Sequence, residues 1–199
     1  MKKVVLVFIH GMGDHQSNYD KKLKDKLKQK LGAEWNNIHC EQILYSERMQ
    51  NNEEELFRRL SSNGLDWNVF RKFMLYNISD AAALCNCIAE PNCPYINTQQ
   101  KIKDALGNAY RALGDNHKNV IIVAHSLGGH VISNYIWDCQ TNNGIWENTA
   151  LKESDDQDRF LRLMHLDYLF TTGCNIPIFV AKKEGATCAG CTLLYFAST

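Results

Sequence analysis

NVIIVAHSLG, residues 119–128, joins the pattern of a buried strand to the pattern of a helix. Val120 to Val123 are apolar and β-branched, which is typical of a short strand inside a parallel sheet. Beyond residue 126, apolar residues recur at helical spacing: Val131, Ile132, Tyr135, Ile136 and Cys139. The segment therefore predicts a strand, a tight turn at Ser126 and a helix.

Ser126 stands between two small residues, Ala124 and Gly128, at the spacing G-x-S-x-G with alanine in the first place. A sharp strand-to-helix turn of this kind presents a serine hydroxyl as a nucleophile. Bulky side chains at the flanking positions would collide with neighbouring backbone, so alanine keeps the requirement for a small residue. We expect Ser126 to be a nucleophile.

A second apolar run, residues 3–9, also predicts a buried strand, and it ends in the turn HGMG at residues 10–13. A glycine-rich turn at a strand end can direct backbone N–H groups at a developing oxyanion. A dinucleotide-binding turn is the alternative, but the segment lacks the third glycine in register and a suitably placed acidic residue.

With HGMG at 10–13 and AHSLG at 124–128, the chain resembles the α/β-hydrolase superfamily, specifically its lipase- and esterase-like serine hydrolases. The resemblance implies a mostly parallel sheet flanked by helices, with an acyl-enzyme formed on Ser126. It implies backbone oxyanion donors at Met12 and Leu127, a small-molecule carboxylic ester as substrate, and no cofactor or metal. It extends over about residues 3–180, so we expect an α/β-hydrolase-like fold that is short at its C-terminus.

The base and the acid of the triad are not evident from the sequence. In the family the order is Ser, then Asp or Glu, then His. Of the histidines after Ser126, His130 lies on the predicted helix and is carried away from the serine, and His165 precedes a strand at the wrong end of the sheet. The candidates for the base are therefore His10 and His15, on either side of the glycine turn. The alternative is a catalytically incomplete protein that binds an acyl or aromatic ligand or a partner chain.

Short apolar strands alternate with helical patterns along the chain, which favours one α/β domain over residues 1–199 with a parallel sheet. The aromatic-rich insertion at about 65–96 is interpreted as a lid over the pocket, or else as the core side of a long helix. A helix over 21–30 carries six lysines beside an apolar face of Tyr19, Leu23, Leu27 and Leu31, and Gly32 ends it. Further elements are expected as strands at 38–45 and 166–172 and as helices beginning near 52 and 97.

Lys+Arg and Asp+Glu both number 22, so the formal net charge is zero, which argues against a general nucleic-acid binder. No apolar run is long enough for a membrane span. Because the apolar start runs straight into the glycine turn, it is interpreted as a strand rather than a signal peptide, and a cytoplasmic location is expected.

Eight cysteines are expected to be mostly reduced thiols in that compartment. A weaker alternative function is a metal or redox module built from Cys85, Cys87, Cys93, Cys188 and Cys191. Finally, the strand at 166–172 is expected to form an uncovered sheet edge, through which a second copy of the chain would pair.

Overall fold

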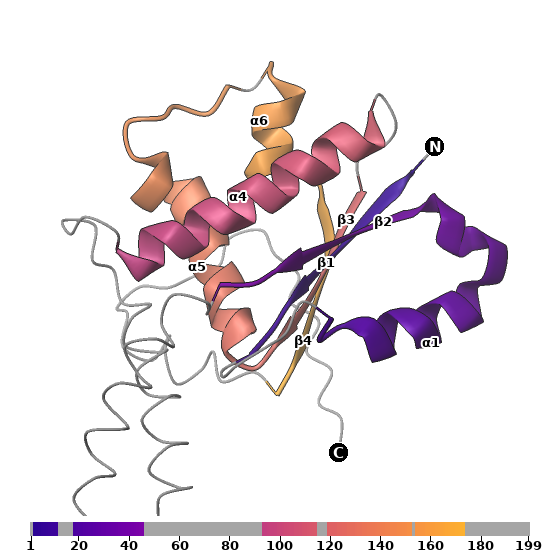
Figure 1. The fold of residues 1–199 in the computed structure, drawn as a ribbon. Coiled ribbons are helices and arrows are strands. Elements are labelled where there is room, and N and C mark those ends of the chain that lie inside the picture. Colours follow the sequence, from indigo (N-terminus) through magenta and orange to yellow (C-terminus); the bar gives the residue numbers. More distant parts are fainter. Residues whose placement is uncertain (1, 12–17, 46–92, 115–118, 153, 174–199) are drawn as a thin grey trace, which may run out of the picture.

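Four of the predicted strands are present and form one parallel sheet (Figure 1). The computed structural model describes residues 2–11, 18–45, 93–114, 119–152 and 154–173. The strands are β1 (Val4–Ile9), β2 (Ile38–Ile43), β3 (Asn119–His125) and β4 (Leu166–Thr172). They lie in the order β2-β1-β3-β4, and every neighbouring pair is parallel.

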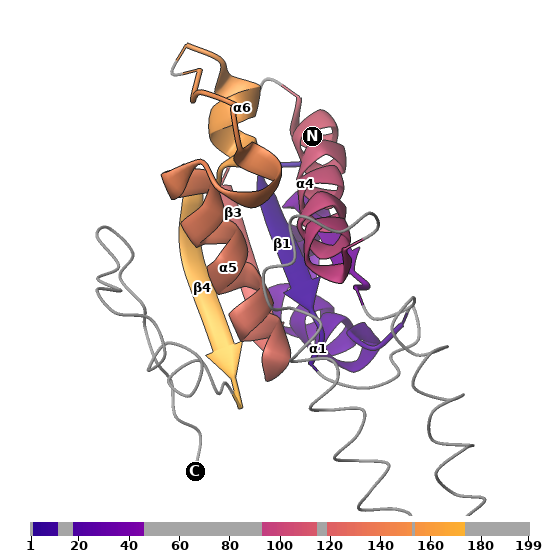
Figure 2. The ribbon, with the colours of Figure 1, turned by 90° about the vertical axis from the view of Figure 1, so that its left-hand side faces the viewer.

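Helices connect the strands, as a parallel sheet requires. They are α1 (Lys21–Leu31), α4 (Pro94–Leu113), α5 (Leu127–Thr141) and the short α6 (Asp156–Leu161), with 3₁₀ turns η1 (Gly32–Asn37) and η2 (Gly144–Trp146). In Figure 2, α4 and α5 lie side by side against one face of the sheet. The chain has the predicted α/β architecture, a parallel sheet flanked by helices, which is compatible with an α/β-hydrolase-like fold.

The hydrophobic core fills the space between that face and the two helices. Alternate residues of the strands point into it because successive side chains of a strand project to opposite faces. Fully buried members include Val5, Val7, Ile9, Ile102, Leu106, Val120, Ile122, Leu127, Ile132 and Tyr135. Within the described residues, no helix is both long and apolar enough to cross a bilayer.

Two helices differ from their predicted form. Helix α4 begins at Pro94 rather than near Asn97, since proline suits the first position of a helix, where its missing N–H is not needed. The described end of the predicted lid, residues 93–96, therefore lies at the start of α4, and the rest lies outside the described residues. Helix α1 ends at Gly32 as predicted, but it buries no side chain. Leu23 and Leu31 are 39% and 40% exposed, so the predicted apolar face is not covered at these two positions.

The cysteines depart from expectation at one position. Cys93, immediately before α4, is disulfide-bonded, whereas Cys40 and Cys139 are free thiols. The expectation of a reduced thiol is thus wrong for Cys93. Disulfides persist mainly in oxidising compartments, which weighs against the expected cytoplasmic location. Cys85, Cys87, Cys188 and Cys191 lie outside the described residues.

Candidate active site

The sheet register brings three segments together at the carboxyl ends of the strands. Ile9 of β1 lies opposite Ile43 of β2 on one side and Ala124 of β3 on the other. The residues two positions further along each of the three segments are Tyr45, Gly11 and Ser126, which therefore lie next to one another. Ligands of open parallel sheets bind at this edge, so the row is the candidate site.

Ser126 occupies the turn between β3 and α5 in a backbone conformation that side chains disfavour. Its φ is 50° and its ψ is −120°, a region that glycine normally fills. The Ser126 N–H donates to the Thr172 carbonyl at 2.8 Å, and the Ser126 carbonyl accepts from the Gly129 N–H at 3.0 Å. The surrounding strand and helix therefore hold the strained turn in place. The predicted strand, turn and helix are all present at residues 119–141.

Glycines on both sides of the turn allow a close backbone approach. A Cβ atom added to Gly128 would lie 2.4 Å from the His10 carbonyl oxygen and 2.8 Å from that of Ile9. A Cβ added to Gly11 would lie 2.9 Å from Ser126 Cβ. The end of β1 and the serine turn are thus in contact, and the contact explains why both positions need a residue without a side chain.

Leu127 is the first residue of α5 and is fully buried. The first N–H groups of a helix have no acceptor within the helix and carry partial positive charge, so an anion beside Ser126 would find a donor here. This is the position predicted for one oxyanion donor. Met12, predicted for the other, lies outside the described residues, directly after Gly11.

His10 is buried, and hydrogen bonds occupy both of its ring nitrogens. The Tyr45 backbone N–H donates to Nε2 at 3.3 Å, so Nε2 is the acceptor and Nδ1 carries the proton. Nδ1 then donates to the Gly11 carbonyl oxygen at 2.7 Å. This neutral imidazole is engaged in holding backbone, which makes His10 poorly suited to take a proton from Ser126.

Two tyrosines that the sequence did not assign to the site contact the His10 ring. The Tyr45 ring stacks on the imidazole with 4.2 Å between centroids and 4° between planes, and the Tyr19 ring meets it edge-on at 5.4 Å. The Tyr19 hydroxyl donates to the Phe8 carbonyl at 2.6 Å. Burial raises the pKa of Tyr19, and the neighbouring Asp20 carboxylate raises it further. No local sequence signal marks Tyr45, because its place beside Gly11 follows from the register between β1 and β2.

The other described histidines lie elsewhere, and that of β2, His39, is paired with Glu41 at 2.6 Å. The His125 ring forms a hydrogen bond with Thr172 Oγ1 at 3.0 Å, towards β4, and the Asn134 side chain donates to His130 at 3.2 Å. His165 precedes β4, and its carbonyl accepts from Val120 at the start of β3. A seven-residue strand, about 20 Å long, separates it from Ser126. His15 lies outside the described residues. The hydrogen bonds of the His10, His125 and His130 rings thus go to groups other than the Ser126 hydroxyl.

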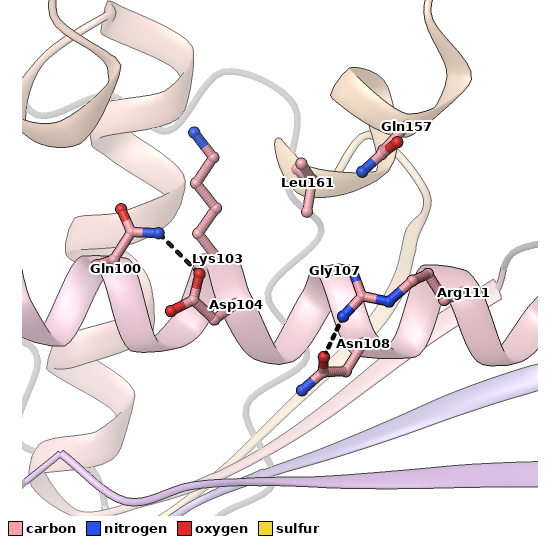
Figure 3. A pocket seen from close by; sticks show the side chains of 8 residues that line it. All are labelled: Gln100, Lys103, Asp104, Gly107, Asn108, Arg111, Gln157 and Leu161. Atoms are coloured by element: carbon pink, nitrogen blue, oxygen red, sulfur yellow. Dashed lines mark hydrogen bonds between the residues drawn. The ribbon is translucent and has the colours of Figure 1, made fainter.

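A hollow of about 330 Å³ lies between α4 and α6 (Figure 3). Its lining is mostly polar: Gln100, Lys103, Asp104, Gly107, Asn108, Arg111, Gln157 and Leu161. Helix α6 precedes β4, so the hollow lies away from the carboxyl ends of the strands, and it contains none of the predicted site residues.

Three comparisons with known proteins found no match to this chain. No family model matches the sequence, no curated protein matches it, and no solved structure matches its fold. The described residues also contain no group of three or more His, Cys, Asp or Glu side chains arranged to hold a metal ion. The inference of function therefore depends on the geometry at Ser126.

Proposed function

We propose that this chain is a serine hydrolase that acts on small-molecule carboxylic esters. The observation that carries the proposal is Ser126 itself, held at φ 50° between β3 and α5 and in contact with the turn after β1. Serine hydrolases of the α/β-hydrolase superfamily present their nucleophile on such a turn. The parallel sheet supports the resemblance that the two sequence motifs suggest.

In the proposed reaction, Ser126 Oγ attacks the ester carbonyl and loses its proton to a base. The tetrahedral oxyanion is stabilised by the N–H groups of Leu127 and Met12. The intermediate then expels the alcohol, which takes up a proton, and leaves an acyl group on Ser126. Water hydrolyses this acyl-enzyme by the same steps, and no cofactor is needed. With His10 bound to backbone, His15 is the candidate for the base.

A fluorophosphonate probe tests for the activated serine. We expect the folded wild-type protein to be labelled and Ser126→Ala to lose the label. Ser133→Ala, a partly buried serine on α5, is the matched control and should keep it. The proposal fails if the folded wild-type protein is not labelled, or if Ser126→Ala is labelled as strongly as wild type.

Turnover of a short-chain nitrophenyl ester tests the base. We expect His15→Ala to lower kcat by a factor of about 10² or more, in the usual range for loss of a general base. The same turnover in His15→Ala as in wild type would exclude His15.

A second candidate function is binding without turnover. It is favoured by one observation: both ring nitrogens of His10, the candidate base that lies within the described residues, are hydrogen-bonded to backbone groups. Such a protein would bind an acyl or aromatic ligand beside Ser126. It would saturate with a nitrophenyl ester analogue, yet hydrolyse the ester no faster than Ser126→Ala does.

A further inference from the structure

The Gly11 carbonyl is held by two side-chain donors from within the fold. His10 Nδ1 donates to it at 2.7 Å and the Tyr45 hydroxyl donates to it at 2.8 Å. The same hydroxyl lies 3.2 Å from the His10 carbonyl. Tyr45 is 3% exposed and His10 is 1% exposed, so water competes little for either bond.

This carbonyl belongs to the peptide group whose N–H is that of the next residue. A peptide group is planar and almost always trans, so its N–H points opposite to its C=O. Holding the Gly11 oxygen against His10 and Tyr45 therefore fixes the plane of this peptide group, to which the proposed second oxyanion donor belongs. Oxyanion stabilisation requires such donors to be aligned before the reaction.

Tyr45 holds the Gly11 carbonyl both directly, through its hydroxyl, and indirectly, through the His10 imidazole. Its backbone N–H fixes the imidazole through Nε2, and its ring stacks on that imidazole. Its hydroxyl then reaches past the imidazole to the carbonyl that Nδ1 also contacts. One residue at the end of β2 thus supports both donors to the Gly11 oxygen.

We infer that Tyr45 is a positioning residue for the reaction at Ser126, acting through the Gly11 peptide. The inference rests on the proposed function and deepens it. In this role Tyr45 does not touch the substrate. It orients the backbone that would bind the oxyanion. Its loss should therefore affect the transition state more than substrate binding.

Tyr45→Phe removes the hydroxyl and keeps the stacked ring and the backbone N–H. We expect kcat for a short-chain nitrophenyl ester to fall about tenfold, less than the loss of a whole oxyanion donor, while KM stays within about twofold. Binding of a boronic acid, which forms a tetrahedral adduct on serine, should weaken by a similar factor. Tyr19→Phe is the matched control, because Tyr19 is also in ring contact with His10 but donates to Phe8 rather than Gly11. It should leave kcat within about twofold.

His10→Gln provides a second route to the same carbonyl. The glutamine amide corresponds to Nε2 rather than Nδ1, so the donor to Gly11 is lost, and kcat should fall by a similar factor. The inference is overturned if folded Tyr45→Phe and His10→Gln both keep wild-type kcat, or if Tyr19→Phe lowers kcat as much as Tyr45→Phe. Failure of wild type itself to hydrolyse the ester or take the probe overturns the proposed function instead, and this inference with it.

Discussion

Ser126 keeps a side chain where the backbone favours glycine. With φ at 50° and ψ at −120°, a residue with a Cβ atom costs roughly 1–3 kcal/mol more than it would in an ordinary turn. The cost is tolerated if the hydroxyl at this point has a use, such as the proposed nucleophilic role. The strain therefore falls on the residue that we propose as the nucleophile.

This strain can be measured with two variants that both remove the hydroxyl. Ser126→Ala keeps a Cβ atom in the strained conformation, whereas Ser126→Gly relieves it. After allowing for the extra flexibility of glycine in the unfolded chain, we expect the glycine variant to be more stable by about 1 kcal/mol. Urea denaturation followed by circular dichroism gives the difference. Equal stability of the two variants would show that the turn is not strained.

Gly128 is required for a different reason, which is space. An alanine there would place its Cβ 2.4 Å from the carbonyl oxygen of His10, directly after β1, and backbone cannot rotate away as a side chain can. We expect Gly128→Ala to lower the free energy of unfolding by about 1–3 kcal/mol. Gly107→Ala is the control, because a Cβ at Gly107 on α4 meets its nearest atom at 3.8 Å. That variant should gain about 0.5–1 kcal/mol from helix propensity. The same sign of change in both variants would contradict the steric argument.

Between elements, Arg162 joins the end of α6 to the end of α5. Its guanidinium donates to the carbonyls of Cys139 and Thr149, both at 2.7 Å, and to the Asp158 carboxylate at 3.2 Å. It also lies over the buried Trp146 ring at 4.4 Å. The charge is buried but well satisfied, so its removal leaves several acceptors without a donor.

Arg162→Ala should therefore destabilise the fold by about 3–5 kcal/mol, the usual cost of breaking a buried charged network. Arg159→Ala, an exposed arginine on the same helix, should change stability by less than about 0.5 kcal/mol. Thermal or urea unfolding of the two variants makes the comparison. A loss below about 1 kcal/mol for Arg162→Ala would mean that water replaces these contacts.

At the scale of elements, the sequence predicted those strands, turns and helices that are determined by a local pattern of residues. Strands β1 and β3 were recognisable because each contains a short apolar run, whereas β2 carries polar residues between its two isoleucines. The Ser126 turn was recognisable because small residues flank a serine between a strand and a helix. The predicted start of α4 near Asn97 is late because Pro94, which suits the first position of a helix, was overlooked. The exposure of α1 could not be predicted, because its apolar spacing says nothing about what covers it.

The contacts of the candidate site depend on the tertiary fold of the whole molecule. Tyr45, Gly11 and Ser126 are far apart in the chain and meet only because three parallel strands are in register. No local pattern contains that register. For the same reason His10 was a reasonable candidate for the base in the sequence, yet both of its nitrogens are bound in the fold.

Within the described residues, β4 is the outermost strand on its side of the sheet, and it pairs there with β3 alone. Tyr168 and Phe170 project from it, 50% and 37% exposed, with their rings stacked 6.0 Å apart. An outer strand offers unpaired N–H and C=O groups, and natural edges are commonly protected by charge. Asp167 is the exposed charged residue of this strand, but Tyr168 and Phe170 beside it are exposed aromatic residues, which favours pairing with a second copy of the chain.

We therefore expect the chain to self-associate at micromolar concentration, as measured by light scattering after gel filtration. Phe170→Lys places a charge on the edge strand and should shift the protein to monomer, because pairing would then bury an ammonium group. Leu23→Lys, on the exposed helix α1, changes an equally exposed apolar residue away from this edge and should leave association unchanged. A wild-type protein that is monomeric throughout, or a dimer that Phe170→Lys does not weaken, would rule out pairing through β4.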